Sequence, residues 1–397
     1  MEVTDVQYKE SEIGVIPVDW NVKKISDFSK PVRGGSPRPA GSPLYFNGDY
    51  IPWLTVAALT NISSSQIFVS ETEGFLTQLG SEYSRTLEKD TLIIANSGAT
   101  LGVAKLLAIK CCANDGIAAL NNFSREVDKA YVVYYINSIT QKLREVVATG
   151  NGQPNLNTTL IGDLRIPLPP TKSEQTAIAT ALSDTDALIE NLEKLIAKKR
   201  NIKQGVMQEL LTGRKRLAGF NGEWVNIKLG DICDIRKGQL ITEKTAAGGE
   251  FPVIAGGINP SYFHNRPNRG KNTITISASG ANAGYVSFHR NPIFASDCST
   301  IEEKGTFNIV YIFFLLQLFQ KKIFKLQTGG AQPHVYPEHL KPLELVFPQE
   351  VTEQDAIANI LIDIDEELSG LEKQMNKYQL IKQGMMQTLL TGKIRLV

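Results

Sequence analysis

Two stretches of the chain carry apolar residues at alternating spacings of four and three positions, a pattern typical of long helices that pack in pairs. The first seam consists of Ile178, Leu182, Ile189, Leu192 and Ile196, and the second of Ile357, Leu361, Ile364, Leu368, Leu371 and Met375. Thr171 and Ser173 are candidate N-caps of the first stretch, and Gly213 and Gly392 are candidate stops. The pattern predicts two helices of about 40 residues, each about 60 Å long.

The two helical stretches are near copies of one another. Residues 174–217 match residues 353–396 without a gap, 179 positions apart, and both contain Ile-Lys-Gln-Gly and Leu-Leu-Thr-Gly. Matches continue upstream at larger spacings, which reach 182 at Ser97 and Ser279 and 204 near the N-terminus. The chain is therefore one unit written twice, a globular part followed by a helix. The second globular part is shorter than the first, and most of the residues that it lacks would lie before the matched serines.

Each helix has one apolar stripe that must be buried, and the simplest solution packs the two helices on each other. A repeat with pseudo-two-fold symmetry makes that pair antiparallel. A length of about 60 Å corresponds to about 17 base pairs of DNA. A simple dimer stalk or scaffold explains the heptads equally well. Gly205 and Gly384 each weaken a helix interior by about 1 kcal/mol, and close approach of a partner helix is one reason to accept that cost.

The globular parts read as mixtures of strands and helices. Residues 91–107 and 272–288 each predict a strand, a glycine turn and a second strand, and residues 132–149 and 309–328 each predict a helix. The expected fold class is α+β, with two α/β domains separated by two long helices in an antiparallel coiled coil. The expected boundaries are 1–165 for the first globular domain, 166–217 for the first helical region, 218–344 for the second globular domain and 345–397 for the second helical region.

Polar and basic loops recur at matched places in the two globular parts. Arginine, lysine, asparagine and glutamine are the side chains that read base edges and hold phosphates. Each loop alone reads as an ordinary solvated turn, and only the recurrence favours DNA contact. The candidate DNA-binding residues are Arg33, Arg38, Asn96, Ser97, Asn151, Gln153 and Asn155 in the first half, and Lys237, Gln239, Arg266, Arg269, Lys271, Asn282, Gln332 and His334 in the second.

The overall composition excludes some classes of protein but does not identify a function. Hydrophobic residues make up 42% and charged residues 21%, which is ordinary for a globular protein, and the net charge of +1 requires any basic surface to be local. The four cysteines form no CxxC pair and read as reduced, buried thiols. The apolar run at 310–319 is too short to span a bilayer, and the N-terminus lacks the order of a signal peptide. We expect a cytoplasmic protein.

Motifs for catalysis are missing from the sequence. Gly392-Lys393 is followed by Ile394 and makes no phosphate-binding loop, and no G-x-G-x-x-G opens a helix. Pro169-Pro170 precedes a helix and is not part of a methyltransferase motif. Glu302-Glu303-Lys304 reads as a charged turn rather than a nuclease site. The four histidines all lie in the second half and form no metal-binding cluster. We therefore expect neither an enzyme nor a cofactor or metal site.

The repeated motifs resemble those of the specificity subunits of type I restriction–modification systems. The resemblance rests on IPLPPTKSEQTAIATAL, IKQGVMQELLTG and GFNGEWVNIKLGDI, and on their second copies FPQEVTEQDAIANIL and IKQGMMQTLLTGKIRL. It covers nearly the whole chain, and the fixed spacing of two copies makes it specific.

The resemblance implies two target-recognition domains, each reading one half of a bipartite, asymmetric site in double-stranded DNA. It implies that two helical regions form an antiparallel coiled coil that sets the spacer and docks two modification (methyltransferase) subunits, with restriction subunits completing a nuclease. S-adenosylmethionine, ATP and Mg would then be used by those partner subunits. Two rival interpretations remain, a fused methyltransferase or nuclease and a coiled-coil scaffold without a DNA role.

Overall fold

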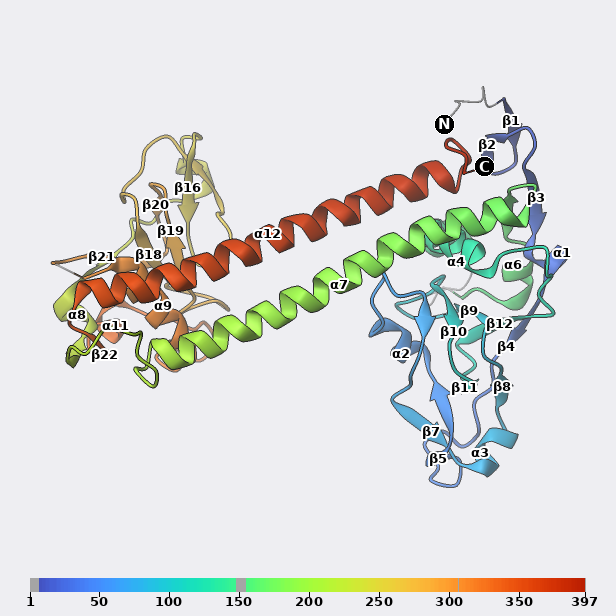
Figure 1. Ribbon diagram of the computed structural model, residues 1–397, viewed down its shortest axis with the longest axis horizontal. Coiled ribbons are helices and arrows are strands. Elements are labelled where there is room, and N and C mark those ends of the chain that lie inside the picture. The colour runs from blue at the N-terminus through green and yellow to red at the C-terminus, as the bar shows by residue number, and fades with distance from the viewer. Residues whose placement is uncertain (1–6, 148–154, 306, 397) are drawn as a thin grey trace. The chain divides into compact units, whose positions relative to one another are not determined.

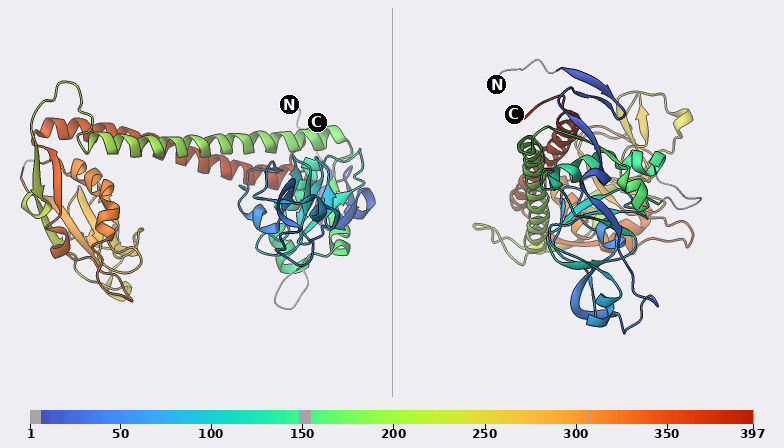
Figure 2. Two further views of the ribbon diagram at one scale, coloured as in Figure 1. Left: turned by 90° about the horizontal axis from the view of Figure 1, so that it is seen from below. Right: turned by 90° about the vertical axis from the view of Figure 1, so that its right-hand side faces the viewer.

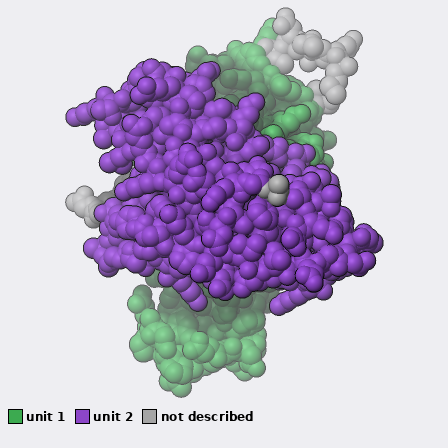
Figure 3. Space-filling view, turned by 90° about the vertical axis from the view of Figure 1, so that its left-hand side faces the viewer, with its two compact units in different colours: residues 1–194, 372–397 green, residues 195–371 purple. Residues whose placement is uncertain are grey.

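The computed structural model describes residues 7–147, 155–305 and 307–396. The chain divides into two compact units (Figure 3). Unit 1 contains Met1–Lys194 and Glu372–Val397, and unit 2 contains Leu195–Leu371. Each unit therefore combines one globular part with segments of both long helices. Among the described residues, no helix is long and apolar enough to cross a membrane.

The two long helices are α7 (Lys172–Leu210) and α12 (Val351–Leu389), each of 39 residues. Thr171 caps α7, because its hydroxyl accepts a hydrogen bond from the Glu174 N–H at 3.2 Å. The other candidate cap, Ser173, lies inside the first turn instead. Gly213 and Gly392 follow the helix ends with φ of 70° and 71°, so both predicted stops are confirmed.

Unit 1 is built on antiparallel-rich sheets (Figure 1). Its five-stranded sheet has the order β4-β12-β9-β10-β6, its four-stranded sheet has the order β7-β5-β11-β8, and two further pairs are β1-β2 and β3-β13. The strands are β1 (Tyr8–Ser11), β2 (Gly14–Pro17), β3 (Asn21–Lys24), β4 (Lys30–Arg33), β5 (Phe46–Leu54), β6 (Phe68–Val69), β7 (Gly74–Leu76), β8 (Arg85–Leu87), β9 (Leu92–Ala95), β10 (Ala104–Leu107), β11 (Cys111–Ala113), β12 (Ile117–Asn121) and β13 (Arg165–Leu168). The short helices are α1 (Ile25–Phe28), α2 (Val56–Thr60), α3 (Gln78–Glu82), α4 (Lys129–Ser138), α5 (Thr140–Lys142) and α6 (Thr158–Gly162).

Unit 2 repeats this plan with fewer strands. Its four-stranded sheet has the order β15-β21-β18-β19, its three-stranded sheet has the order β17-β16-β20, and β14 pairs with β22. The strands are β14 (Trp224–Lys228), β15 (Cys233–Lys237), β16 (Phe251–Ile254), β17 (Tyr262–His264), β18 (Thr273–Ser277), β19 (Val286–His289), β20 (Phe294–Ala295), β21 (Cys298–Glu303) and β22 (Glu344–Pro348). The short helices are α8 (Leu229–Ile232), α9 (Ile309–Leu318), α10 (Gln320–Phe324) and α11 (Pro337–Leu340).

The strand–turn–strand predictions at 91–107 and 272–288 are confirmed as β9–β10 and β18–β19. The two predicted helices that follow are wrong in length. The first ends at Ser138 and continues as α5 and a π-helical turn (Leu143–Val147), and the second ends at Leu318 and continues as α10. Beyond the first break, Leu143 is buried in the core of unit 1. Neither break contains a glycine or proline, so no local signal in the sequence marks it.

The seam residues pack both between the long helices and onto the globular parts. Ile178 and Leu182 belong to the core of unit 1 together with Trp20 and α4, and Ile357 and Leu361 belong to the core of unit 2 together with α9. Ile189, Leu192, Ile196 and Leu368 are also buried, whereas Ile364, Leu371 and Met375 are half-buried. Burial is therefore deepest where a globular part covers the helix pair.

Ion pairs between α7 and α12 recur in both units with their partners exchanged. Lys382 pairs with Asp186 at 2.5 Å in unit 1, and Lys203 pairs with Asp365 at 2.6 Å in unit 2. The two pairs are related residue by residue by the 179-residue repeat. In both cases an early residue of one helix meets a late residue of the other, so the helices run antiparallel in each unit (Figures 1 and 2).

A second matched contact closes the ends of the helices. Arg395 binds both carboxylate oxygens of Glu174 at 2.5 and 2.8 Å, and Arg216 binds those of Glu353 at 2.7 and 2.8 Å. Each guanidinium also lies over a tryptophan ring, Trp20 in unit 1 and Trp224 in unit 2, at 5.7 and 5.6 Å. The pseudo-two-fold repeat therefore extends from the sequence to individual side-chain contacts.

Gly205 and Gly384 have a different environment from the one we expected. A Cβ added at either glycine would meet no atom within 4 Å, and both residues are exposed. Close approach of a helix from within the described chain therefore does not explain them, and that interpretation is wrong.

Candidate nucleic-acid interface

The loop after β4 crosses a turn between two strands in unit 1, and Gly34 makes that crossing possible. A Cβ at Gly34 would lie 2.1 Å from the Asn114 carbonyl oxygen, closer than any side chain tolerates. The Gly34 and Gly35 N–H groups donate to the carbonyl oxygens of Ile117 and Ala113 at 2.8 and 2.9 Å. The basic loop that begins at Arg33 is thereby held directly on residues 114–116.

Asp115 is the centre of this loop cluster. The Ser36 hydroxyl donates to its Oδ1 at 2.7 Å, and the Arg38 guanidinium lies 3.6 Å from its Oδ2. Arg33 Nε and Asn96 Nδ2 donate to its carbonyl oxygen at 2.6 and 3.2 Å. The hydrogen bond from Ser36, aided by the two arginines, lowers the pKa of the Asp115 carboxyl, which is therefore ionised at neutral pH.

The other first-half candidates lie around the same turn. Ser97 follows β9 and lies beside this turn at residues 114–116. A Cβ added at Gly116 would lie 3.1 Å from the Ser97 hydroxyl. Asn155 adjoins Leu156, whose N–H donates to the Asn96 carbonyl at 2.8 Å. Asn151 and Gln153 lie outside the described residues. Arg33, Arg38, Asn96, Ser97 and Asn155 thus come together, although they are distant in sequence.

Unit 2 builds the matching cluster with the same device. A Cβ at Gly238 would lie 2.0 Å from the Ser296 carbonyl oxygen, so the loop after β15 crosses the chain as closely as its counterpart does. The Ser279 hydroxyl donates to the Asp297 carboxylate, and the Gly280 N–H donates to the Pro333 carbonyl at 3.1 Å. These bonds join the loops that carry Asn282 and Gln332.

Aromatic rings give the second cluster a different surface. His334 and Tyr336 stack with ring centroids 5.5 Å apart and planes 5° from parallel, and Lys237 Nζ lies 5.8 Å from the centroid of Tyr336. Gln239 is exposed beside this group, and its N–H donates to the Ala295 carbonyl at 2.9 Å. The first cluster presents guanidinium groups, and the second presents amides, an ammonium group and an imidazole.

Arg269 differs from the other candidates because its guanidinium group is already committed to the fold. It donates to Thr300 Oγ1 at 2.8 Å, to the carbonyl oxygens of Asn268 and Lys237 at 2.8 and 3.0 Å, and pairs with Glu302 at 3.0 Å. Its side chain is 13% exposed. Arg269 therefore fastens its segment to β15 and β21, while Arg266 and Lys271 on the same segment are exposed.

The clusters also contain residues that are not among the candidates: Asp115, Asp297, Arg85, Tyr336, Ser36 and Ser279. Arg85 Nε donates to the Arg33 carbonyl at 2.5 Å and joins the first cluster. A signal for the two aspartates was present, since they are 182 positions apart like Ser97 and Ser279. Residue chemistry alone does not select the aspartates, because carboxylates are poor partners for phosphates.

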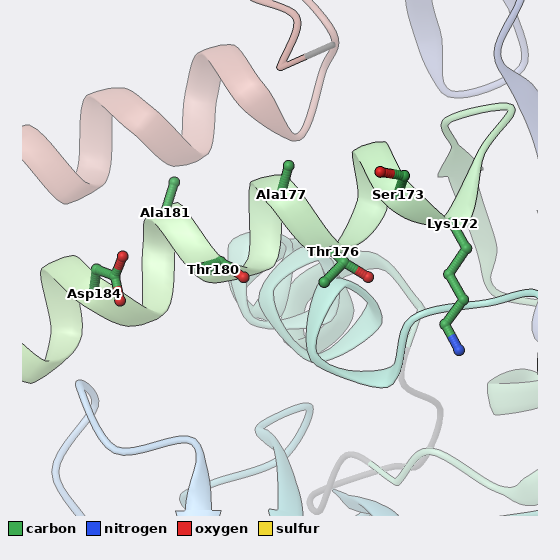
Figure 4. Close-up of a pocket in the computed structure, with 7 residues that line it drawn as sticks. All are labelled: Lys172, Ser173, Thr176, Ala177, Thr180, Ala181 and Asp184. Carbon is green, nitrogen blue, oxygen red and sulfur yellow. The ribbon is translucent and has the colours of Figure 1, made fainter.

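A shallow depression on unit 1 is lined by Lys172, Ser173, Thr176, Ala177, Thr180, Ala181 and Asp184, all from successive turns of α7 (Figure 4). It contains no cluster of catalytic groups. Within the described part of the chain, no group of three or more His, Cys, Asp or Glu could hold a metal ion. The four cysteines are buried, and burial raises the pKa of Cys111, Cys233 and Cys298 to about 12.

Comparisons with known proteins agree with this architecture. Residues 17–199 and 221–382 match the family model described as type I restriction modification DNA specificity domain. The type I restriction enzyme MjaVIII specificity subunit of Methanocaldococcus jannaschii is 24% identical over 98% of this chain and 96% of its own length. A putative type I specificity subunit of Mycoplasma genitalium is 25% identical over 66% of this chain and 71% of its own length.

A solved structure has the same fold. The S subunit of a type I restriction–modification system from M. genitalium superposes with a TM-score of 0.70 at 19% identity, covering 98% of both chains. The two family matches, one per repeat, cover most of the present chain.

The chain therefore belongs to the family of type I restriction–modification DNA specificity proteins. Its role is DNA recognition within such a system, as a specificity subunit and not as an enzyme. This membership confirms the resemblance and the α+β fold with an internal repeat, and it excludes the scaffold without a DNA role.

Proposed function

We propose that each globular part reads one half of a bipartite, asymmetric DNA site. The observation that carries the proposal is the construction of one loop frame twice, around Gly34 and Gly238, with different side chains on each copy. An arginine-rich loop suits guanine O6 and N7, whereas amides suit adenine N6 and N7, so the two halves would select different bases.

The helix pair would set the gap between the half-sites and dock modification subunits. Support for docking comes from the Ile-Lys-Gln-Gly motifs, where Ile202 and Ile381 are 41% and 40% exposed beside the open glycines Gly205 and Gly384. The same surface occurs once in each unit, which fits two modification subunits. S-adenosylmethionine, ATP and Mg would be used by the modification and restriction subunits rather than by this chain.

Modified-base sequencing of the source strain, with and without this gene, tests the reading role. Deletion is expected to abolish methylation at one motif made of two short half-sites around a fixed gap. Replacing residues 218–344 with those of another family member is expected to change one half-site only. An unchanged set of methylated motifs after deletion, with the neighbouring methyltransferase still expressed, would contradict the proposal.

A further inference from the structure

Two carboxylates, Asp115 and Asp297, occupy the same place in the two loop clusters, and the proposed function does not yet use them. Asp115 follows β11 and precedes β12, and Asp297 follows β20 and precedes β21. Their separation of 182 residues equals that of Ser97 and Ser279. Both therefore lie where the candidate reading loops of their unit meet.

The carboxylate is retained in both units, while its hydrogen-bond donor is not. Asp115 is held by Ser36 from the loop after β4, whereas Asp297 is held by Ser279 from the loop after β18. The position that matches Ser36 in the second repeat is Leu240, which has no hydroxyl. An aspartate present only to fasten one loop would keep its donor on that loop. The retained feature is instead a carboxylate at the junction.

The carboxylate of Asp115 is also accessible and charged. Its side chain is 40% exposed, and the hydrogen bond from Ser36 lowers its pKa. A negative charge on a surface that approaches phosphates is unfavourable unless it receives a compensating hydrogen bond. Bonds from Ser36 and Arg38 occupy only part of its acceptor capacity, since an ionised carboxylate offers about four lone-pair sites.

Base chemistry supplies a matching donor. In the major groove, cytosine N4 and adenine N6 present amino groups, whereas guanine N7 and O6 and thymine O4 present only acceptors. An ionised carboxylate accepts hydrogen bonds and cannot donate them, so it favours the first pair of bases and repels the second.

We propose that Asp115 and Asp297 are specificity-determining residues, each accepting a hydrogen bond from the exocyclic amino group of one cytosine or adenine in its half-site. The inference rests on the proposed bipartite reading. It adds that each half-site contains one position at which an amino group is required and at which a single side chain sets the choice.

The test compares the methylated motif of the wild type with those of Asp115→Asn and Asp297→Asn. Asparagine keeps the shape and can accept from serine, but its amide can also donate, so it tolerates guanine or thymine. Asp115→Asn is expected to relax selectivity about 10- to 100-fold at one position of one half-site, and Asp297→Asn to do so in the other half. Gap and remaining positions stay unchanged. Asp163→Asn, an exposed carboxylate of unit 1 paired with Lys24, is the matched control and leaves the motif intact.

Two further measurements separate reading from loop fastening and from misfolding. Ser36→Ala removes the donor but not the carboxylate, so reading predicts an unchanged motif and fastening predicts the Asp115→Asn phenotype. The wild-type subunit, assembled with its methyltransferase, is also titrated with DNA that lacks one amino group, because purine replaces one adenine or 2-pyrimidinone replaces one cytosine. The replaced base is the one at which the aspartate variant relaxes selectivity. If no position relaxes, each adenine and cytosine of the half-site is replaced in turn. A loss of about tenfold or more in affinity at one position per half-site supports the proposal.

Retention of the wild-type motif by both aspartate variants, with full affinity for the amino-free DNA, would overturn the aspartate proposal while leaving bipartite reading intact. A wild type that directs methylation to no bipartite motif would overturn both.

Discussion

Lys105 is a buried lysine of unit 1, and the charges of the Asp186–Lys382 ion pair between the long helices act on its pKa. It is 2% exposed, and its ammonium group donates to the carbonyl oxygens of Ser63, at 3.0 Å, and of Gln66. Burial, and then the neighbouring charge of Lys382, lowers the pKa of Lys105 to about 8, with partial compensation by Asp186. In the unfolded chain the same group titrates near 10.5.

This difference predicts a pH dependence of stability with a definite sign. The folded state disfavours the charged form, so the cost is complete below pH 8 and is relieved as pH rises towards 10.5. Between pH 7 and 9.5, wild type is expected to gain about 2 kcal/mol of unfolding free energy relative to Lys105→Met. Urea denaturation of both proteins across this range measures the difference, and the methionine variant cancels all other titrations. A difference that stays flat or falls with pH would disprove the assignment.

Sequence patterns locate Lys105 only as a polar residue in an apolar strand. Its pKa also depends on Asp186 and Lys382, which come from two helices distant in the sequence. The loop candidates behave similarly: residue chemistry selected Arg33 and Arg269 alike, but only folding distinguishes the exposed side chain from the one bound by Thr300 and Glu302. The sequence gives the residue type, but it does not show whether the hydrogen-bond donors of that residue already have partners within the fold.

The long helices are the elements that the sequence predicts best. Heptad spacing, proline before each stretch and glycine after it all act locally, so the observed bounds of 172–210 and 351–389 follow from them. The breaks after Ser138 and Leu318 could not be predicted, because no glycine or proline marks either of them. Leu143, beyond the first break, is buried in the core of unit 1, and local sequence patterns do not contain such long-range packing.

Gly205 and Gly384 allow a prediction at the scale of these helices. Since no atom of the described chain lies within 4 Å of an added Cβ, alanine is expected to stabilise the isolated subunit by about 0.5–1 kcal/mol per site. If a modification subunit packs closely at the glycines, the same variants weaken its binding. Denaturation of the isolated subunit and sedimentation of the assembled complex measure the two effects.

The control for these variants is Gly370→Ala. Gly370 also lies in α12 with nothing within 4 Å of an added Cβ, but outside the Ile-Lys-Gln-Gly motif. Its alanine variant is expected to gain stability without losing assembly. Unchanged assembly in the Gly205 and Gly384 variants would remove the docking argument, and unchanged stability would contradict the open environment.

At the scale of the whole molecule, the repeat and the compact units do not coincide. Unit 1 takes its core from the first repeat and also from Leu389 and Leu390 at the end of the second. Unit 2 likewise takes Met207, Leu210 and Leu211 from the first repeat. Each globular part is thus completed by the helix of the other copy, because antiparallel pairing brings the end of one helix to the start of the other.

This exchange makes helix length a shared property of both repeats, which gives the proposed spacer role a sharp test. Seven residues inserted in α7 between Lys194 and Leu195, and seven in α12 between Leu371 and Glu372, preserve the seam and the contacts within each unit. At 1.5 Å per residue, the gap in the methylated motif is expected to lengthen by about three base pairs with both half-sites unchanged. An insertion in only one helix is the control, because it shifts Lys203 from Asp365 or Lys382 from Asp186 and should impair folding instead. A double insertion that folds and methylates with the original gap would show that the helix pair does not set the spacing.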